Sequence, residues 1–380
     1  MTRALVCCVL LVGLTGCASP APAGAPASAG QPAGAAPTAP AGADPSEHVV
    51  VAIQGQLAIK RPSWSQFVPA IFGTLVRVGD ELKLEGSSVA RIACSDLSLV
   101  TVKAGAVGVP CQVVKPVMLF QGSSIRATRA DTGSGFPTVL APRKTSLLAE
   151  RPLIRWAAVT GATAYKVSLH GPNVVDWSAE VVGKTELQYP DSAPALTPGE
   201  AYKVTVVATT PTGSRSSDEE AAADLGFVVL KPEERQAVRD AQARIDKLEL
   251  EEAQKRFLVA KLYTARDNRL YAEAIDQLEA LDKSLAEPAV GRTLAESYRA
   301  VSLNRAAEEH YRAALDRSQM AGDVEGQALA QEALGQLESA LGSSAEAVQR
   351  TQQALELYQS LGDAGKVKEL QDRLASLPKA

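Results

Sequence analysis

The sequence predicts a multidomain β plus α chain: a small all-β domain, then a β-sandwich, then an all-α helical solenoid. Three observations support this prediction. Between residues 48 and 230, short runs rich in β-branched residues alternate with Gly, Ser and Pro, as in antiparallel β domains. From Pro232 onward Gly and Pro become rare, and apolar residues recur at helical spacing. Within this helical part Ala274, Ala307 and Ala347 lie 33 and 40 residues apart, which indicates a structural repeat.

The N-terminus predicts a secretory signal over residues 1–16. Arg3 supplies a short basic start, and the apolar run that follows it is too short to span a bilayer. Next comes Leu14-Thr15-Gly16-Cys17, which resembles a bacterial lipobox. The resemblance implies a lipoprotein with diacylglycerol on the Cys17 thiol and a further acyl chain on the freed amine, and several chains hold far better than one. An ordinary secreted protein with a chance Gly-Cys is the alternative.

Residues 17–46 are expected to form the lipid anchor and a disordered linker. After Cys17 they are nearly all Ala, Pro, Gly and Ser, and lack the large apolar groups that would offset the entropy of ordering. Because Ala18 rather than an aspartate follows Cys17, the lipobox resemblance implies sorting to the outer membrane in a Gram-negative host. The later domains would then lie outside the cytoplasm.

Two of the five cysteines remain after the signal and the lipid site are set aside. Cys94 and Cys111 are an even pair in an oxidising compartment, so we expect a disulfide, with two buried free thiols as the alternative. No histidine or second Cys-x-x-Cys lies near them in the sequence, so no metal site is expected.

Residues 48–128 are expected to form the first β domain. The run from Gly73 to Cys94, GTLVRVGDELKLEGSSVARIAC, places a Gly-Asp turn between two strand candidates, 74–78 and 81–84. This run resembles the FecR-like periplasmic domain, which implies a fold but carries over no functional residue. The chain lacks the cytoplasmic segment and membrane helix through which such regulators reach a sigma factor, so their signalling role does not transfer.

Residues 137–230 are expected to form the second β domain, a sandwich whose strands recur every 10 to 15 residues. The run from Leu196 to Tyr202, LTPGEAY, resembles the fibronectin type III approach to a tyrosine corner. The resemblance implies that the Tyr202 hydroxyl bonds to the upstream backbone while its ring packs in the core. Trp156 fits the buried tryptophan of that family. Trp177 is expected in the core or at its rim, with a sugar-stacking platform as the alternative.

Residues 232–380 are expected to hold an entry helix at 233–252, three helical repeats and a closing helix at 366–377. Small and aromatic residues fall at the spacings of a tetratricopeptide repeat, to which this region is similar. The small residues let neighbouring helices approach closely. A plain helical bundle or coiled coil is the alternative. The expected repeats cover residues 255–284, 288–318 and 325–360.

The tetratricopeptide resemblance implies that the first helix of each repeat lines a concave inner face, which binds an extended or helical peptide. Arginine offers a bidentate fork to carboxylates, so the expected ligand is an acidic motif or a chain terminus of an envelope protein. The alternative is that the candidate side chains named below are solvated surface groups and bind no partner. The candidate partner-binding residues are Tyr263, Arg266, Arg292, Glu296, Arg299 and Gln336.

Composition and motifs favour a protein without catalytic activity. A formal net charge of −4, without Lys/Arg clusters, argues against nucleic acid as a partner. His48, His170 and His310 lack metal-ligand spacing, and no phosphate-binding loop or nucleophile elbow occurs. No cofactor, metal or small-molecule substrate is expected. The sequence therefore predicts a membrane-anchored envelope lipoprotein that acts as a protein-interaction scaffold. The alternatives are a FecR-like envelope sensor and a cell-wall or polysaccharide-binding accessory protein.

Overall fold

The computed structural model describes residues 47–105, 108–111, 135–172, 174–220 and 225–377. The predicted signal, the lipidation site Cys17 and the linker lie outside these residues. Within them, no helix is both long enough and apolar enough to cross a bilayer.

The first β domain consists of two small antiparallel sheets, with strand orders β4-β1-β6-β7 and β3-β2-β5. Strand β5 shows why the sequence folds this way, because Leu82 and Leu84 are buried while the alternating Glu81 and Lys83 are exposed. Gly79 turns the chain into β5 with a φ of +100°, which favours glycine. The strands are β1 (His48–Gln54), β2 (Leu57–Lys60), β3 (Val68–Ala70), β4 (Leu75–Val76), β5 (Glu81–Leu84), β6 (Val89–Ala93) and β7 (Leu99–Lys103).

The second β domain is a sandwich of two sheets, β13-β10-β8 and β12-β11-β14-β16-β9, with β15 pairing along β14. Its longest pair places Val167 of β11 opposite Val206 of β14, and both are fully buried. The strands are β8 (Val139–Ala141), β9 (Thr145–Leu147), β10 (Leu153–Trp156), β11 (Ala164–Gly171), β12 (Val174–Val181), β13 (Glu186–Gln188), β14 (Ala201–Thr210), β15 (Gly213–Ser216) and β16 (Phe227–Val229), with a short 3-10 turn at Ser217–Glu219.

The tyrosine corner forms as the fibronectin resemblance implies. The Thr197 amide donates to the Tyr202 hydroxyl oxygen over 2.7 Å, and the Tyr202 ring is buried. Trp156 is 1% exposed in the same core. Trp177 is partly buried and lies edge-on to Tyr189, which is the core-rim position expected for it.

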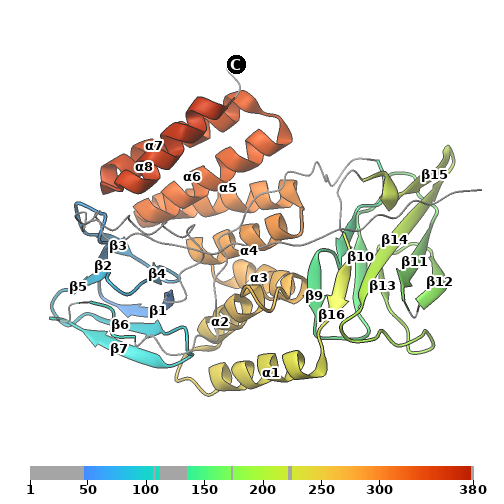
Figure 1. The fold of residues 1–380 in the computed structure, drawn as a ribbon, viewed down its shortest axis with the longest axis horizontal. Coiled ribbons are helices and arrows are strands. Elements are labelled where there is room, and N and C mark those ends of the chain that lie inside the picture. Colours follow the sequence, from blue (N-terminus) through green and yellow to red (C-terminus); the bar gives the residue numbers. More distant parts are fainter. Residues whose placement is uncertain (1–46, 106–107, 112–134, 173, 221–224, 378–380) are drawn as a thin grey trace, which may run out of the picture. The chain divides into compact units, whose positions relative to one another are not determined.

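The helical region consists of three consecutive helical hairpins between a first and a last single helix (Figure 1). Gly322, Gly342 and Gly362 end α5, α6 and α7 in the left-handed conformation. Gly335 permits close helix packing, because a Cβ there would lie 2.7 Å from the Thr351 hydroxyl. The helices are α1 (Pro232–Asp246), α2 (Glu252–Thr264), α3 (Tyr271–Ser284), α4 (Pro288–Ala300), α5 (Asn304–Ala321), α6 (Val324–Leu341), α7 (Ser344–Leu361) and α8 (Ala364–Ser376).

The two β domains contact the helices in different ways. Core residues of the first domain, such as Val49 and Val51, belong to one apolar cluster with Phe257 of α2 and Val290 of α4. A second mixed cluster joins this domain to α6, α7 and α8. The core of the second β domain is built from residues 139–229, and among the described helical residues Ala272 packs against it. Leu140, Leu148 and Leu230 of this domain join the apolar cluster of the helices.

Candidate functional site: the inner face of the repeats

The loop from Arg61 to Gln66, between β2 and β3, lies against the turn between α7 and α8. The Ser65 amide donates to the Leu361 carbonyl over 3.0 Å, and the Trp64 indole N–H donates to Asp363 Oδ2 over 3.2 Å. Gly362 permits this approach, because a Cβ there would lie 3.0 Å from the Ser65 nitrogen. The first β domain is therefore bound to the repeats through backbone groups as well as side chains.

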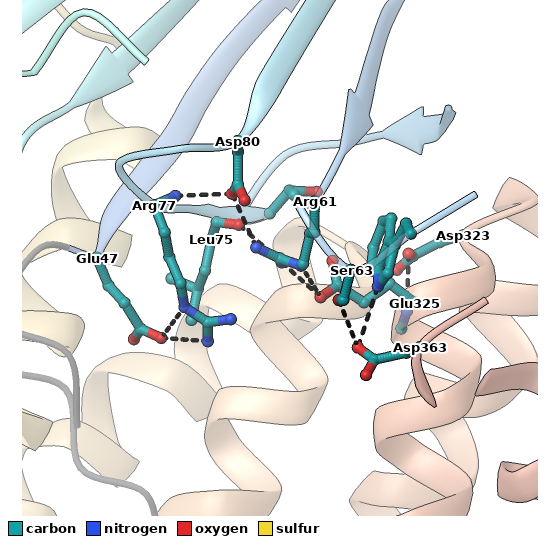
Figure 2. Close-up of polar contacts among 12 residues, drawn as sticks. Glu47, Arg61, Ser63, Leu75, Arg77, Asp80, Asp323, Glu325 and Asp363 are labelled. Atoms are coloured by element: carbon teal, nitrogen blue, oxygen red, sulfur yellow. Dashed lines mark hydrogen bonds and ion pairs between the residues drawn. The ribbon is translucent and has the colours of Figure 1, made fainter. Parts of the chain in front are cut away.

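Arg61 is the central charged group of this contact (Figure 2). It is 7% exposed, and its Nη1 lies 2.9 Å from Asp80 Oδ2 of its own domain. Its Nε donates to Glu325 Oε1 of α6 over 2.9 Å, and Nη2 donates to the Leu75 carbonyl over 3.1 Å. The guanidinium also lies over the Trp64 ring, 5.0 Å from its centroid. Arg61 thus links Asp80 and Leu75 of the first β domain to Glu325 of the helices through buried and partly buried bonds.

The carboxylates around Arg61 are held by local structure. Glu325 lies in the first turn of α6, where the helix dipole favours a negative charge. Asp323 precedes that helix and accepts the Gly326 amide as its cap. Burial raises the pKa of Glu325 and of Asp80, and in both cases the opposing effect of Arg61 is smaller. Removing Arg61 would leave the buried Asp80 carboxyl and the partly buried Glu325 carboxyl without their main partner.

A cavity of about 200 Å³ remains between the first β domain and the inner face. Arg292 and Glu296 of α4 line it from the helical side, together with Lys261 of α2. Lys261 is buried, and the loss of hydration lowers the pKa of its ammonium group. Two of the predicted partner-binding residues therefore face another part of the same chain.

The other predicted residues fall into two groups. Arg299 and Gln336 are brought together, because Arg299 Nη1 donates to Gln336 Oε1 over 3.3 Å. Tyr263 is 6% exposed, and its hydroxyl donates to Gln242. Arg266 is exposed in the turn after α2 rather than on a helix. The structure thus places Tyr263 and Arg266 away from the Arg299–Gln336 pair.

Sequence reasoning missed the residues that make the observed contact, above all Arg61, Trp64, Glu325 and Asp363. Glu325 lies in the first turn of α6 and Asp363 caps α8, so their local patterns indicate helix starts and not a contact. Arg61 and Trp64 lie in a loop whose local pattern indicates no binding role. Arg61 and Glu325 are 264 positions apart, so no local signal links them.

The predicted disulfide joins Cys94 to Cys111, with their Cα atoms 5.6 Å apart. The fold adds a histidine that is distant in the sequence, because His48 lies beside this pair, with all three potential ligand atoms within 4.8 Å of one another. The residues do not fit a metal in this form. Both sulfurs are used in the disulfide, and His48 Nδ1 accepts the Ser95 amide over 3.0 Å.

No family model matches the chain, and no curated protein matches it. Among solved structures, MamA is 20% identical over 37% of this chain and 81% of its own, with a TM-score of 0.27. A TPR-domain containing protein from Parabacteroides distasonis is 11% identical over 88% of this chain and 96% of its own, with a TM-score of 0.17. The FN1–FN3 domains of chicken CNTN1 are 10% identical over 50% of this chain and 57% of theirs, with a TM-score of 0.18.

Matches at these scores carry no argument about function. The class of protein is defined by its own elements, which are β-rich domains followed by a TPR-like region of helical hairpins. In this chain a β domain contacts the inner face of the helices.

Proposed function

We propose that the protein is a membrane-anchored envelope lipoprotein that acts as a non-catalytic protein-interaction scaffold through its helical repeats. The observation that carries the proposal is that the repeat region holds a folded β domain by an apolar core, backbone hydrogen bonds and buried charges. The same helices thus have the apolar, polar and charged groups that protein recognition requires.

Two of the three histidines support a non-catalytic role. His48 is buried beside the disulfide and accepts a backbone amide. His310 stacks on the Tyr298 ring, with centroids 5.3 Å apart. Burial lowers the pKa of His310. Both side chains are used in packing, which leaves the scaffold as the function that the fold supports best.

The partner site we propose is the part of the inner face formed by Arg299 of α4 and Gln336 of α6. Arg299 is half-buried, and its Nε is a buried atom without a hydrogen-bond partner in the described part of the chain. A carboxylate of an acidic motif or a chain terminus would pair with the guanidinium group as a whole. Arg292 and Glu296 then act indirectly, by lining the cavity against the first β domain.

The experiment is a quantitative capture of envelope proteins by the full chain, compared with Arg299→Glu. The variant is expected to lose the specific partner, because it reverses the charge offered to a carboxylate. Lys368→Glu is the matched control, since Lys368 is 77% exposed on α8 and pairs only with Asp372 among the described residues. Retention of every partner by a folded Arg299→Glu protein would refute the site. Capture of glycan alone would replace the scaffold by the polysaccharide-binding alternative.

Lipid anchoring is tested separately at Cys17. Intact-mass analysis is expected to show acyl mass on the mature N-terminal peptide, and none after Cys17→Ser. A mature protein that is soluble and unacylated would remove the membrane part of the proposal, while leaving the scaffold part standing.

A further inference from the structure

A groove of about 1420 Å³ lies between the first β domain and the turns that precede α2 and α4. One wall is formed by β1, β2 and β3 with the loops beside them, and the other by residues 248–255 and 285–287. Pockets for small ligands usually have volumes of roughly 300–1,000 Å³, so this groove is larger than one small molecule needs. Its size suits a stretch of peptide.

The groove has apolar side chains that the chain leaves partly uncovered. Phe67, next to β3, is 38% exposed. Ile53 and Phe72 are partly buried on the same wall, and Leu250 and Leu285 are partly buried on the helical wall. Single apolar groups on a surface need no explanation, but several in one groove are typical of a site that binds another protein.

The three cations that line the groove are engaged within the chain. Lys83 pairs with Glu85 over 2.8 Å. Arg91 and Lys255 donate to backbone carbonyls at the end of α1 and in the turn that follows it. An acidic ligand would therefore have to compete with an existing bond at each of these cations.

The other three carboxylates that line the groove differ from these cations. Glu249, Glu251 and Glu287 form no ion pair within the described part of the chain. Glu251 and Glu287 directly precede α2 and α4, so the helix starts fix their positions on the helical wall. Glu287 is partly buried, and burial raises the pKa of its carboxyl. The charge that this groove lacks is therefore a positive one.

We propose that this groove binds an extended segment of another protein, in which lysine or arginine alternates with bulky apolar residues. Successive side chains of an extended segment point in opposite directions. Such a segment presents apolar groups to the wall that holds Phe67 and cations to the wall that holds Glu251 and Glu287. Arg299 and Gln336 do not line the groove, so this surface is separate from the partner site proposed above and does not rest on it.

The test measures the binding of short peptides to the full chain by calorimetry, at low salt so that charge contacts are not screened. The probe is blocked at both ends, and in it two lysines alternate with leucine, valine and phenylalanine. Its counterpart has glutamates in place of the lysines. We expect the lysine peptide to bind saturably with one-to-one stoichiometry, and the glutamate peptide to bind at least tenfold more weakly.

Two carboxylate variants test the charged wall. Glu251→Gln combined with Glu287→Gln is expected to weaken binding of the lysine peptide at least fivefold, because two charge contacts are lost. The matched control combines Glu233→Gln with Glu346→Gln, which changes exposed carboxylates in the first turns of α1 and α7 that do not line the groove. This control is expected to bind the peptide as the parent protein does.

A change at Phe67 tests the apolar wall. Phe67→Ala is expected to weaken binding of the lysine peptide at least tenfold. Met320→Ala is the control, since Met320 is 81% exposed and does not line the groove. The exposure of both side chains favours folded variants, and circular dichroism checks this.

Equal affinity for the two peptides would overturn the inference, as would binding that survives the Glu251 and Glu287 changes. Absence of saturable binding would also overturn it, and would indicate that other residues of this chain fill the groove. Arg299→Glu is expected to bind the lysine peptide normally. The groove and the Arg299 site can therefore fail separately.

Discussion

The two β domains differ in how they depend on the helices. The first shares its apolar core with α2, α4, α6, α7 and α8. The second closes a core of its own and meets the helices at a smaller joint, where Leu148 and Leu230 pack against the helical cluster and Arg143 donates to the Val301 carbonyl. The longest described strand of the first domain has seven residues, whereas β11 and β12 of the second have eight and β14 has ten. A small domain cannot bury enough apolar surface alone, and here the helices supply the missing face.

The largest expected effect distinguishes the core that the first β domain shares with the helices from the separate core of the second β domain. Phe257 is 1% exposed, and its ring lies 4.9 Å from that of Phe72. We expect Phe257→Ala to lower the free energy of unfolding by about 3–5 kcal/mol for the first β domain and the helices together. Phe227→Ala, an equal truncation in the separate core, is expected to affect the second β domain alone. Hydrogen exchange resolved by segment measures both, and equal loss in all segments would contradict the comparison.

The second-largest expected effect comes from removing Arg61, the buried charge between the first β domain and α6. Arg61→Ala is expected to cost about 3 kcal/mol in urea unfolding, because Asp80 and Glu325 stay buried without their partner. Lys60→Ala, the neighbouring position with a half-exposed partner, is expected to cost less than about 1 kcal/mol. Equal effects of the two changes would show that Arg61 is solvated and that the contact is loose.

The joint of the second domain is expected to respond to pH through Glu273 of α3. Burial raises the pKa of this carboxyl to about 7, although the Leu148 amide donates to its Oε1. The folded state therefore holds the proton more tightly than the unfolded state, and stability falls as pH rises from about 4.5 to 7. We expect Glu273→Gln to be more stable than the parent protein across that window. The difference in the free energy of unfolding is expected to reach about 3 kcal/mol above pH 7. Parallel stability–pH curves for the two proteins would exclude this role.

The smallest expected effect lies wholly inside the second domain. Tyr202→Phe removes the hydroxyl that accepts the Thr197 amide and keeps the ring in the core. The expected cost is about 1–2 kcal/mol, confined to the second domain's unfolding transition. If the helices also lost stability in this variant, the second β domain would be coupled to the helices as tightly as the first.

Local features were predictable because local chemistry specifies them. The helix ends at Gly322 and Gly362, the cap at Asp323 and the alternation in β5 each depend on a few neighbouring residues. The tyrosine corner spans only the segment from Thr197 to Tyr202. The Cys94–Cys111 pairing followed from elimination among five cysteines.

The candidate site was less predictable, because its contacts join distant positions. The sequence placed Arg292 and Glu296 on one helical face, but it did not show that a β domain would lie opposite them. Arg61 and Trp64 became site residues only when their loop reached α6 and the α7–α8 turn. Similarly, His48 lies beside the disulfide only because β1 pairs with β6.

The sequence by itself determined the class of each segment, since periodicity, turn residues and caps act over a few residues and require no partner. Tertiary structure alone decided which surfaces of the helices remain available. Apolar burial is non-directional, so the sequence of an amphipathic helix does not determine which surface packs against its apolar face. In this protein the first β domain covers much of the inner face, and the joint of the second leaves a small cavity with both polar and aliphatic lining.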